Sequence, residues 1–432
     1  MLAYYKRKGF MKFKRINILA FSLNRGGAAK AAFRFFSIAT QVPSIKVEVL
    51  TVEESPRNYC RAWHFVKRVI SLACVFRYQK KCEVKCSVNF FSYKPALQFL
   101  SNDDAIINIH WINNDTISIF DLKKIPYGSI ITMHDEWFYC GIEHLFSVTK
   151  DFRESEYHAA NEIGSIKFDS AIHRFVWGRK RKAFCGRKDL LVTCPSKWLA
   201  DRAKASHVFH DCDVKVLYNP IDTNLFQPMK AIRTDRQRRE ICLGDRMLIV
   251  FGAIGGTSNK LKGFSELEDA LKLLANNEAL KDKVMLGLFG GHKRDLNELH
   301  GFPVHQFGFI ANGKKMAEVY SLAHVTVVPS KIEAFGQVAA ESQSCRTPVI
   351  AFDTSGLRDV VIDGGTGFLA DPYSPISLAE KIEQLLCLST DQYDQLCNDA
   401  RNHVIQNFSN DVIAQQYGKI INEQLIKKQD AC

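Results

Sequence analysis

Residues 325–341 read VTVVPSKIEAFGQVAAE. The stretch opens with an apolar run of strand length, Val325–Val328, and passes through a loop into a segment of helical composition. We expect this helix to begin near Phe335 or Gly336, so that Glu333 lies in the loop and Glu341 lies more than one turn inside the helix. A buried strand followed by a helix is the repeating unit of a parallel sheet.

The same alternation runs through the whole chain of 432 residues. Nearly continuous apolar runs indicate strands that are buried on both faces. Helical spacing of apolar residues occurs between them, for example in 264–275 and 377–388. The chain therefore predicts an α/β protein with two Rossmann-like, doubly wound parallel-sheet domains. The predicted strands are 16–21, 46–50, 105–110, 129–134, 190–194 and 214–218 in the first domain, and 247–253, 284–289, 304–309, 325–328, 348–352 and 367–370 in the second.

Composition narrows the class of protein. Apolar residues make up 46 % and charged residues 24 %, which is ordinary for a globular chain that buries a core. No window holds 18 consecutive apolar residues, which argues against a membrane-spanning helix, and no cleavable signal follows the basic start. The 13 cysteines are scattered, so we expect a cytoplasmic protein with reduced thiols. Cys82 and Cys86 have the spacing of half a metal site, but no second pair at ligand spacing accompanies them, so we expect no zinc site.

Positive charge is concentrated in residues 1–100, which carry 19 Lys and Arg against 4 Asp and Glu, a net of +15. The whole chain has a net charge of +12. Such asymmetry indicates a surface that faces a polyanion, either nucleic acid or anionic lipid headgroups, although a solvated basic surface also fits. Within this region, residues 63–81 mix aromatic and aliphatic side chains with Lys and Arg, a mixture typical of membrane interfaces.

Two glycine-containing turns follow predicted strands. Gly26 and Gly27 come directly before a predicted helix, 29–39, whose amino end favours an anion such as a diphosphate, although an ordinary strand-to-helix turn also fits. A second glycine-rich loop, 251–264, ends in Lys260 and Lys262, which can neutralise phosphate oxygens. The chain has neither the G-x-G-x-x-G fingerprint nor a P-loop, which counts against dinucleotide oxidoreductases and P-loop enzymes.

Glu333 and Glu341 are the most specific signal. Carboxylates accept hydrogen bonds from sugar hydroxyls, and the backbone N–H groups at Phe335 and Gly336 are donors for phosphate. A structural alternative is a solvated Glu341 with Glu333 as a helix-start acid that the dipole favours. The neighbours Ala339, Ala340 and Cys345 make a solvated face for Glu341 the weaker reading.

These motifs resemble the retaining glycosyltransferases of family 4. The E-x7-E signature matches Glu333 and Glu341, and further matches are 194–199, 219–222, 347–351 and 365–369. The segment 132–137, which reads TMHDEW, resembles the subset of enzymes that build colanic acid, capsules and other bacterial surface polysaccharides. The resemblance runs from about residue 16 to the C-terminus.

The resemblance implies a GT-B fold, in which two Rossmann-like domains face a central cleft. It implies an acceptor-binding domain over 11–220, a nucleotide-sugar-binding domain over 221–401, and a last helix, 402–428, that crosses back to the first domain. The polar stretch 222–245 is expected to be the linker with a short helix. An NDP-sugar donor, a saccharide or lipid-linked saccharide acceptor and retention of anomeric configuration follow from the same resemblance.

Residue roles are carried over from the family in the same way. Glu341 resembles the residue that holds the ribose hydroxyls, and Glu333 resembles the one that contacts the donor sugar. Lys262 resembles the diphosphate-binding lysine, with the amides at Phe335 and Gly336 supporting the donor. His134 resembles the histidine near the reacting carbon of the sugar, and Gly26 and Gly27 resemble the glycine loop of the first domain. Many members have an arginine where this chain has Gly256; either Lys260 substitutes for it, or the diphosphate has one cation fewer.

No cofactor and no metal are expected. Asp211-Cys212-Asp213 has the D-x-D spacing of metal sites in another glycosyltransferase fold, but it precedes a predicted strand, at the end away from the expected ligand. The membrane reading predicts peripheral contact of residues 1–100 with the inner face of the cell membrane and no nucleic-acid partner. The alternatives are a sugar-nucleotide epimerase or phosphorylase-like enzyme, a basic nucleic-acid-binding protein, and an inactive lectin-like subunit.

Overall fold

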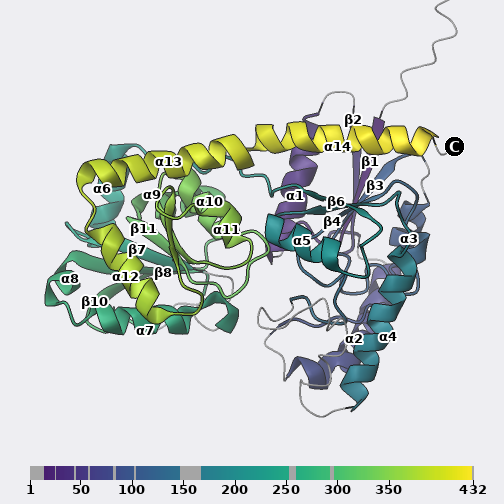
Figure 1. The fold of residues 1–432 in the computed structure, drawn as a ribbon, viewed down its shortest axis with the longest axis horizontal. Coiled ribbons are helices and arrows are strands. Elements are labelled where there is room, and N and C mark those ends of the chain that lie inside the picture. Colours follow the sequence, from purple (N-terminus) through teal and green to yellow (C-terminus); the bar gives the residue numbers. More distant parts are fainter. Residues whose placement is uncertain are drawn as a thin grey trace, which may run out of the picture. The chain divides into compact units, whose positions relative to one another are not determined.

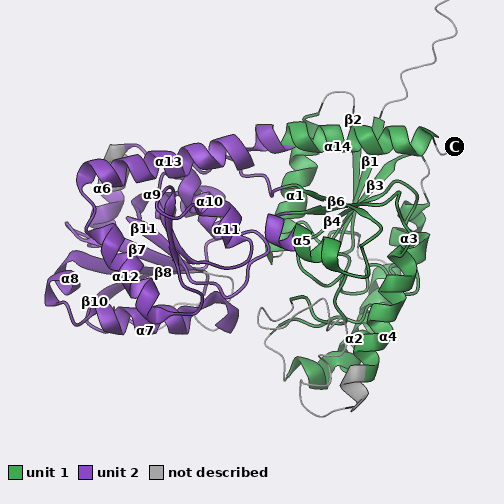
Figure 2. Cartoon of the chain, in the orientation of Figure 1, with its two compact units in different colours: residues 1–194, 200–217, 414–432 green, residues 195–199, 218–413 purple. Residues whose placement is uncertain are grey.

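The computed structural model describes residues 14–24, 26–42, 45–56, 59–80, 84–101, 104–145, 167–252, 259–291 and 296–430. It divides the chain into two compact units (Figure 2). Unit 1 consists of residues 1–194, 200–217 and 414–432, and unit 2 consists of residues 195–199 and 218–413.

Unit 1 is built on a six-stranded sheet in the order β2-β1-β3-β4-β5-β6, and all of its strand pairs are parallel. The central strand β3 is buried along its whole length, including its two polar residues, Asn108 and His110. The strands are β1 (Lys14–Ala20), β2 (Ile45–Thr51), β3 (Ile106–His110), β4 (Ile130–Thr132), β5 (Leu191–Cys194) and β6 (Asp213–Val216).

Helices pack around this sheet, and one of them comes from the far end of the chain (Figure 1). That helix, α14, places Tyr417 edge-on against Phe35 of α1, with ring centroids 5.3 Å apart. It also receives a hydrogen bond from Lys14 Nζ of β1 at Asn422 Oδ1. The helices of unit 1 are α1 (Gly26–Thr40), α2 (Tyr59–Gln79), α3 (Lys94–Leu100), the short η2 (Leu122–Lys124), α4 (Lys167–Phe184) and most of α5 (Lys197–Ala205) and of α14 (Asn410–Asp430).

Unit 2 contains a seven-stranded sheet in the order β13-β12-β11-β7-β8-β10-β9. Its pairs are parallel except for the short β9, which runs antiparallel to β10 at the edge. The strands are β7 (Met247–Gly252), β8 (Val284–Phe289), β9 (Glu298–Leu299), β10 (Phe302–Gly308), β11 (Val325–Val328), β12 (Val349–Phe352) and β13 (Gly367–Ala370).

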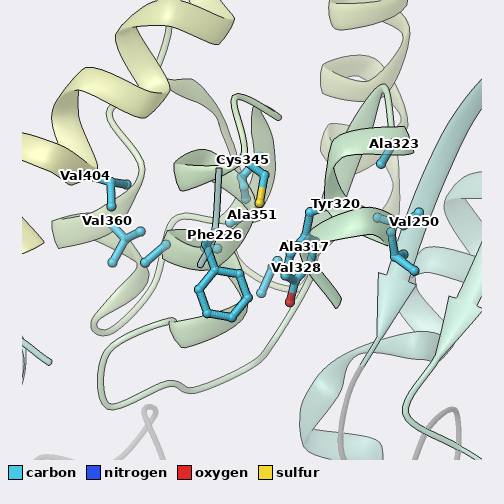
Figure 3. Packing of buried hydrophobic residues seen from close by; sticks show 14 of the residues in the cluster. Phe226, Val250, Ala317, Tyr320, Ala323, Val328, Cys345, Ala351, Val360 and Val404 are labelled. Carbon is cyan, nitrogen blue, oxygen red and sulfur yellow. The ribbon is translucent and has the colours of Figure 1, made fainter. Parts of the chain in front are cut away.

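Both faces of the unit 2 sheet are covered. Successive residues of β7 point to opposite faces, so Leu248 and Val250 join one core cluster while Ile249 and Phe251 join the other. Figure 3 shows the first cluster around Phe226, Val250 and Tyr320. The helices of unit 2 are α6 (Ala231–Glu240), η5 (Lys260–Lys262), α7 (Phe264–Leu274), α8 (Glu278–Lys283), α9 (Gly313–Leu322), α10 (Gln337–Ser344), α11 (Leu357–Val360), α12 (Pro375–Leu386) and α13 (Thr390–Phe408).

All twelve predicted strands are present, with ends that differ by a few residues. The stretch 222–245, expected to be a linker, lies inside unit 2, because Phe226 and Leu243 are buried in its core. The unit boundary falls at Tyr218, close to the expected residue 221. In place of the one predicted last helix there are two, α13 and α14, because the extended backbone of Ser409 ends the first of them.

Among the described residues, no helix is both long enough and apolar enough to cross a membrane. The cysteines that it describes are free thiols. Cys82, one half of the metal-site candidate, lies outside the described residues.

Candidate active site

A glycine in unit 2 brings the lysine turn η5 against the loop after β11. Gly263 has φ +70°, and a Cβ built on it would lie 1.8 Å from the backbone oxygen of Pro329. Only glycine permits this approach. The backbone N–H of Lys331 donates to Leu261 O at 2.9 Å, which joins the two loops directly.

Lys262 and Glu333 form an ion pair across this junction, between Lys262 Nζ and Glu333 Oε1. The Ser330 hydroxyl donates to the same carboxylate oxygen at 3.0 Å. Both charged side chains keep part of their surface exposed, 26 % for Lys262 and 20 % for Glu333. A cation and a carboxylate that were predicted to bind different parts of one donor are therefore adjacent and open to solvent.

The loop that carries Glu333 is held by its backbone. Glu333 N–H donates to Ser355 Oγ at 2.9 Å, and Gly356 N–H donates to Glu333 O at 2.9 Å. A Cβ on Gly356 would lie 2.6 Å from Ala334 O, so the second contact also depends on glycine. Such bonds fix the position of the Glu333 carboxylate before any ligand arrives.

The helix after this loop starts as the sequence predicts. Gly336 is the N-cap of α10, with φ +107°, and Glu341 lies more than one turn inside the helix. Glu341 is buried, and Tyr320 donates its hydroxyl to Glu341 Oε2 at 3.4 Å. Since its side chain is not on a solvated face, the structural alternative for Glu341 does not hold.

Phe335 precedes the N-cap of α10, and its ring faces the core. Its ring is buried and packs edge-on against Phe408 of α13, with centroids 5.3 Å apart. The first-turn N–H groups of a helix have no intrahelical acceptor, so the amino end of α10 offers donors next to the Glu333 loop.

Lys260 starts the same turn as Lys262, and the Asn259 side chain caps that turn by accepting from Leu261 N–H at 3.1 Å. The glycine-rich residues 253–258, including Gly256, lie outside the described residues. Lys260 as a substitute for the family's arginine stays a prediction.

In unit 1, Gly26 and Gly27 are the first two residues of α1, after the loop that follows β1. Gly26 has φ +90°, and a Cβ on either glycine would meet no atom within 4 Å. Glu54, three residues after β2, accepts from Ser22 Oγ at 2.8 Å and from Asn24 Nδ2 at 3.0 Å, which holds the loop before α1 from one side. Local sequence pattern did not point to Glu54, because these partners lie 32 and 30 residues earlier in the chain.

His134 follows β4 at the carboxyl edge of the unit 1 sheet, where ligands bind in such sheets. Its Nε2 lies 3.0 Å from Nδ1 of His110, the last residue of β3, and the two rings stack. Burial lowers the pKa of His134 to about 4, and the nearby Asp135 offsets only part of that effect. His134 is therefore a neutral imidazole at physiological pH.

Asp135 is the centre of a buried hydrogen-bond network that local sequence pattern did not reveal. Its Oδ2 accepts from Trp111 Nε1 at 2.7 Å and lies 2.6 Å from His144 Nδ1. The Nε2 of His144 lies 2.8 Å from Ser87 Oγ. Burial alone would raise the pKa of Asp135, but His144 and the donated hydrogen bonds bring that pKa below its usual value. Asp135 is thus an anion that positions the chain beside His134.

The predicted site residues fall into two groups, one on each unit. Lys260, Lys262, Glu333, Phe335, Gly336 and Glu341 belong to unit 2, and the loops that carry them join β7 and β11 to their helices. Gly26, Gly27 and His134 belong to unit 1. Asp211 and Asp213, the D-x-D candidate, lie at the amino end of β6, where Asp211 Oδ2 accepts from Gly186 N–H at 2.9 Å.

The part of unit 2 that holds Lys262, Glu333 and Glu341 also matches a known family. Residues 234–403 match the model of the family described as glycosyl transferases group 1. The group 1 segment contains every unit 2 residue of the candidate site.

Curated relatives are similar to part of this chain. A D-inositol 3-phosphate glycosyltransferase of Xylanimonas cellulosilytica is 37 % identical over 150 residues, which are 33 % of this chain and 34 % of the relative. The matches span less than half the length of the first curated relatives.

Two solved structures have the same fold across nearly the whole chain. Sucrose-phosphate synthase from Thermosynechococcus elongatus has a TM-score of 0.64 at 16 % identity and covers 96 % of this chain and 100 % of its own. Anabaena Alr3699/HepE, solved with UDP-glucose, has a TM-score of 0.59 at 18 % identity and covers 96 % and 99 %. The predicted fold class, GT-B with two parallel-sheet α/β domains, is confirmed.

Proposed function

We propose that the protein is a glycosyltransferase that moves a sugar from a nucleotide-diphosphate-sugar to a saccharide acceptor. The observation that carries the proposal is the Lys262–Glu333 pair, held on two loops that glycines bring together within the group 1 segment. A lysine ammonium neutralises a diphosphate, and a carboxylate accepts hydrogen bonds from sugar hydroxyls. One donor molecule would engage both.

The main requirement of glycosyl transfer is that the negative charge on the leaving diphosphate be stabilised. The transition state resembles an oxocarbenium ion, so negative charge builds on the departing phosphate. Lys262 and the N–H donors at the amino end of α10 would stabilise that charge without a metal ion. Glu333 would orient the sugar, and Glu341 would hold the ribose hydroxyls. The acceptor proton would pass to the departing phosphate, with retention of anomeric configuration.

The donor is tested by incubating the protein with UDP-, GDP- and ADP-sugars and measuring nucleoside diphosphate release with and without saccharide acceptors. We expect release to require an acceptor and to persist in EDTA. Release without an acceptor would favour an epimerase-like or hydrolytic reaction. Loss of activity in EDTA that Mg²⁺ restores would contradict the metal-independent step.

The acceptor that we propose is a lipid-linked saccharide of bacterial surface polysaccharide synthesis, met at the inner face of the cell membrane. Helix α2 supports membrane contact, because its solvent side is apolar. Only a narrow stripe of α2 is buried, formed by His64, Ser71, Val75 and Tyr78. The large apolar side chains on its other sides are between 47 % and 81 % exposed: Tyr59, Trp63, Phe65, Val66, Val69, Ile70, Leu72 and Phe76.

Charge on α2 complements an anionic bilayer. The helix carries Arg61, Lys67, Arg68 and Arg77 and contains no Asp or Glu. Exposed apolar patches of this size mark interaction surfaces, and basic residues around an apolar face are typical of interfacial helices.

Vesicle flotation tests this contact. The protein should bind vesicles with anionic lipid more tightly than neutral vesicles, and added salt should weaken that binding. Replacement of Phe65 and Phe76 by Ser should reduce binding, whereas Phe33→Ser, an exposed phenylalanine on α1, should not. Equal binding to neutral vesicles would remove the electrostatic part of the proposal. Binding to DNA in preference to vesicles would favour the nucleic-acid alternative.

A further inference from the structure

The amide of Asn108 has one orientation. Its Nδ2 lies 3.3 Å from the backbone oxygen of Ile130, which can only accept, and 2.9 Å from Thr132 Oγ1. Asn108 Oδ1 therefore points the other way, where it accepts the buried hydroxyl of Tyr417 from α14. The four residues lie within unit 1, and the hydrogen bonds determine which end of the amide is the oxygen.

This oxygen decides where His110 carries its proton. His110 Nε2 lies 3.1 Å from Asn108 Oδ1, and an amide oxygen has no proton to give, so Nε2 must donate. The His110 ring is fully buried, and the partners of its two nitrogens are a neutral amide and a second imidazole. Burial, and after it the nearby His134, hold the pKa of His110 well below its usual range. His110 therefore carries one proton, on Nε2, and its Nδ1 is an acceptor.

The position of the proton on His134 follows from that on His110. His110 Nδ1 lies 3.0 Å from His134 Nε2, and because His110 Nδ1 is bare, His134 Nε2 must donate. A neutral His134 then has no proton left for Nδ1. The Asn108 amide thus determines, over two imidazoles, the tautomer of the residue at the carboxyl edge of the sheet.

We propose that Asn108 and His110 are positioning residues that hold His134 in the Nε2–H tautomer, so that His134 presents a bare Nδ1 that accepts a hydrogen bond from a sugar hydroxyl of a substrate. In this state His134 cannot donate a proton to the leaving group from Nδ1. The proposal rests on the proposed glycosyl transfer for the sugar contact, whereas the tautomer itself follows from hydrogen bonds within unit 1.

The tautomer is measured directly on the full-length protein. Long-range ¹H–¹⁵N correlation spectra of protein labelled at the histidine rings distinguish Nε2–H from Nδ1–H imidazole. His134→Gln and His110→Phe identify the two signals among the 13 histidines. At pH 7 we expect both residues to show a protonated Nε2 and a bare Nδ1. A protonated Nδ1 on His134 would overturn the proposal without any activity measurement.

Asn108→Asp tests the direction of the effect. A buried carboxylate beside Nε2 favours the cationic form of His110, whose Nδ1–H would then donate to His134 Nε2 and move the His134 proton to Nδ1. We expect the His134 signal to change tautomer and kcat/KM for the nucleotide-sugar to fall about 10-fold, on the order of one hydrogen bond. KM for the acceptor should stay within twofold. An unchanged kcat/KM in a variant whose tautomer has moved would refute the role of His134.

Two further variants keep the test decisive. His110→Phe preserves the ring that packs against Phe35, at 5.5 Å, but removes the acceptor, so the His134 signal should become a mixture of tautomers. Tyr417→Phe removes a buried hydrogen bond from the same network yet leaves the Nδ2 bonds of Asn108, so it should lower stability without moving the tautomer. A tautomer change in Tyr417→Phe would contradict the assigned order. If no nucleotide-sugar is turned over, the proposed function fails while the wild-type spectrum still decides the tautomer.

Discussion

Lys262 and Glu333 neutralise each other while no donor is bound, so the diphosphate must compete with Glu333 for the ammonium. We expect Lys262→Ala to lower kcat/KM for the nucleotide-sugar by about 10²–10³-fold, because it removes a charge that stabilises the leaving group. Glu333→Gln keeps the shape but weakens the contact with sugar hydroxyls, and we expect a loss of about 10–10²-fold. Steady-state kinetics with a varied donor measure both changes.

The matched control for these variants is Lys272→Ala in α7, which breaks an exposed lysine pair with Asp269 at 2.8 Å. Exposed pairs contribute about 0–1 kcal/mol to stability, so all three variants should stay folded in thermal unfolding. Wild-type kinetics in Lys262→Ala, or an equal loss in Lys272→Ala, would contradict the assignment of the donor site.

The candidate site was predictable from sequence only where its residues are close along the chain. Glu333 and Glu341 lie on one strand–loop–helix unit, and Lys262 follows a strand, so local pattern identified them. Asn108 is held by Thr132 and Tyr417, and Glu54 contacts Ser22, partners that are distant in sequence. The amide and imidazole groups around His134 have a definite proton arrangement only because the sheet places β3 beside β4.

At the scale of elements, the contact between η5 and the loop after β11 depends on Gly263. Gly263→Ala would place a methyl group on Pro329 O and force a side chain into a left-handed conformation. We expect a loss of about 2–4 kcal/mol in the unfolding free energy and a higher KM for the nucleotide-sugar, since Lys262 would move away from Glu333. Urea unfolding and donor kinetics test the two effects.

Gly244→Ala separates backbone strain from the loss of this contact. Gly244 also has a positive φ, +59°, but a Cβ there meets no atom within 4 Å. It should cost about 1–2 kcal/mol and leave KM unchanged. Equal effects of the two variants on KM would show that the approach of Gly263 to Pro329 has no role in donor binding.

Sequence pattern predicted the elements well where a strand is buried along its length. It predicted them poorly where contacts with distant parts of the chain determine whether an element forms. The strands were found because both faces of each sheet are covered by apolar side chains. The two-residue β9 is too short to carry a pattern, and it exists because it pairs with β10. The stretch 222–245 has a polar composition, but a few apolar residues such as Phe226 are enough to bury it in unit 2.

At the scale of the whole molecule, buried neutral histidines make stability depend on pH. Burial lowers the pKa of His64, His134 and His324 to about 4, whereas an unfolded histidine titrates near 6.5. Between these values the unfolded chain binds more protons, so the unfolding free energy must fall as the pH falls from about 6.5 to 4.

Unit 1 should be the more acid-sensitive unit, because it contains His64, His110 and His134, while His324 lies in unit 2. We expect a loss of about 1–3 kcal/mol in unit 1 between pH 7 and pH 5, measured by urea unfolding with hydrogen exchange to distinguish the units. His64→Phe, which keeps a ring against Tyr93, should make this dependence shallower. Stability that rises on acidification would contradict the neutral state of these histidines.

The C-terminal helix α14 packs on unit 1, and the buried face of α14 supplies the stabilising contacts. Tyr417 is fully buried against Phe35 and Asn108, whereas Ile426 of the same helix is 58 % exposed. Tyr417→Ala should lower the unfolding free energy of unit 1 by about 3–5 kcal/mol, and Ile426→Ala should change it by less than about 0.5 kcal/mol. Hydrogen exchange should show the loss in β1 and β3 and leave β11 and β12 protected. Equal loss in both units would mean that the helix stabilises the chain as a whole, and α14 could not then be assigned to the packing of unit 1.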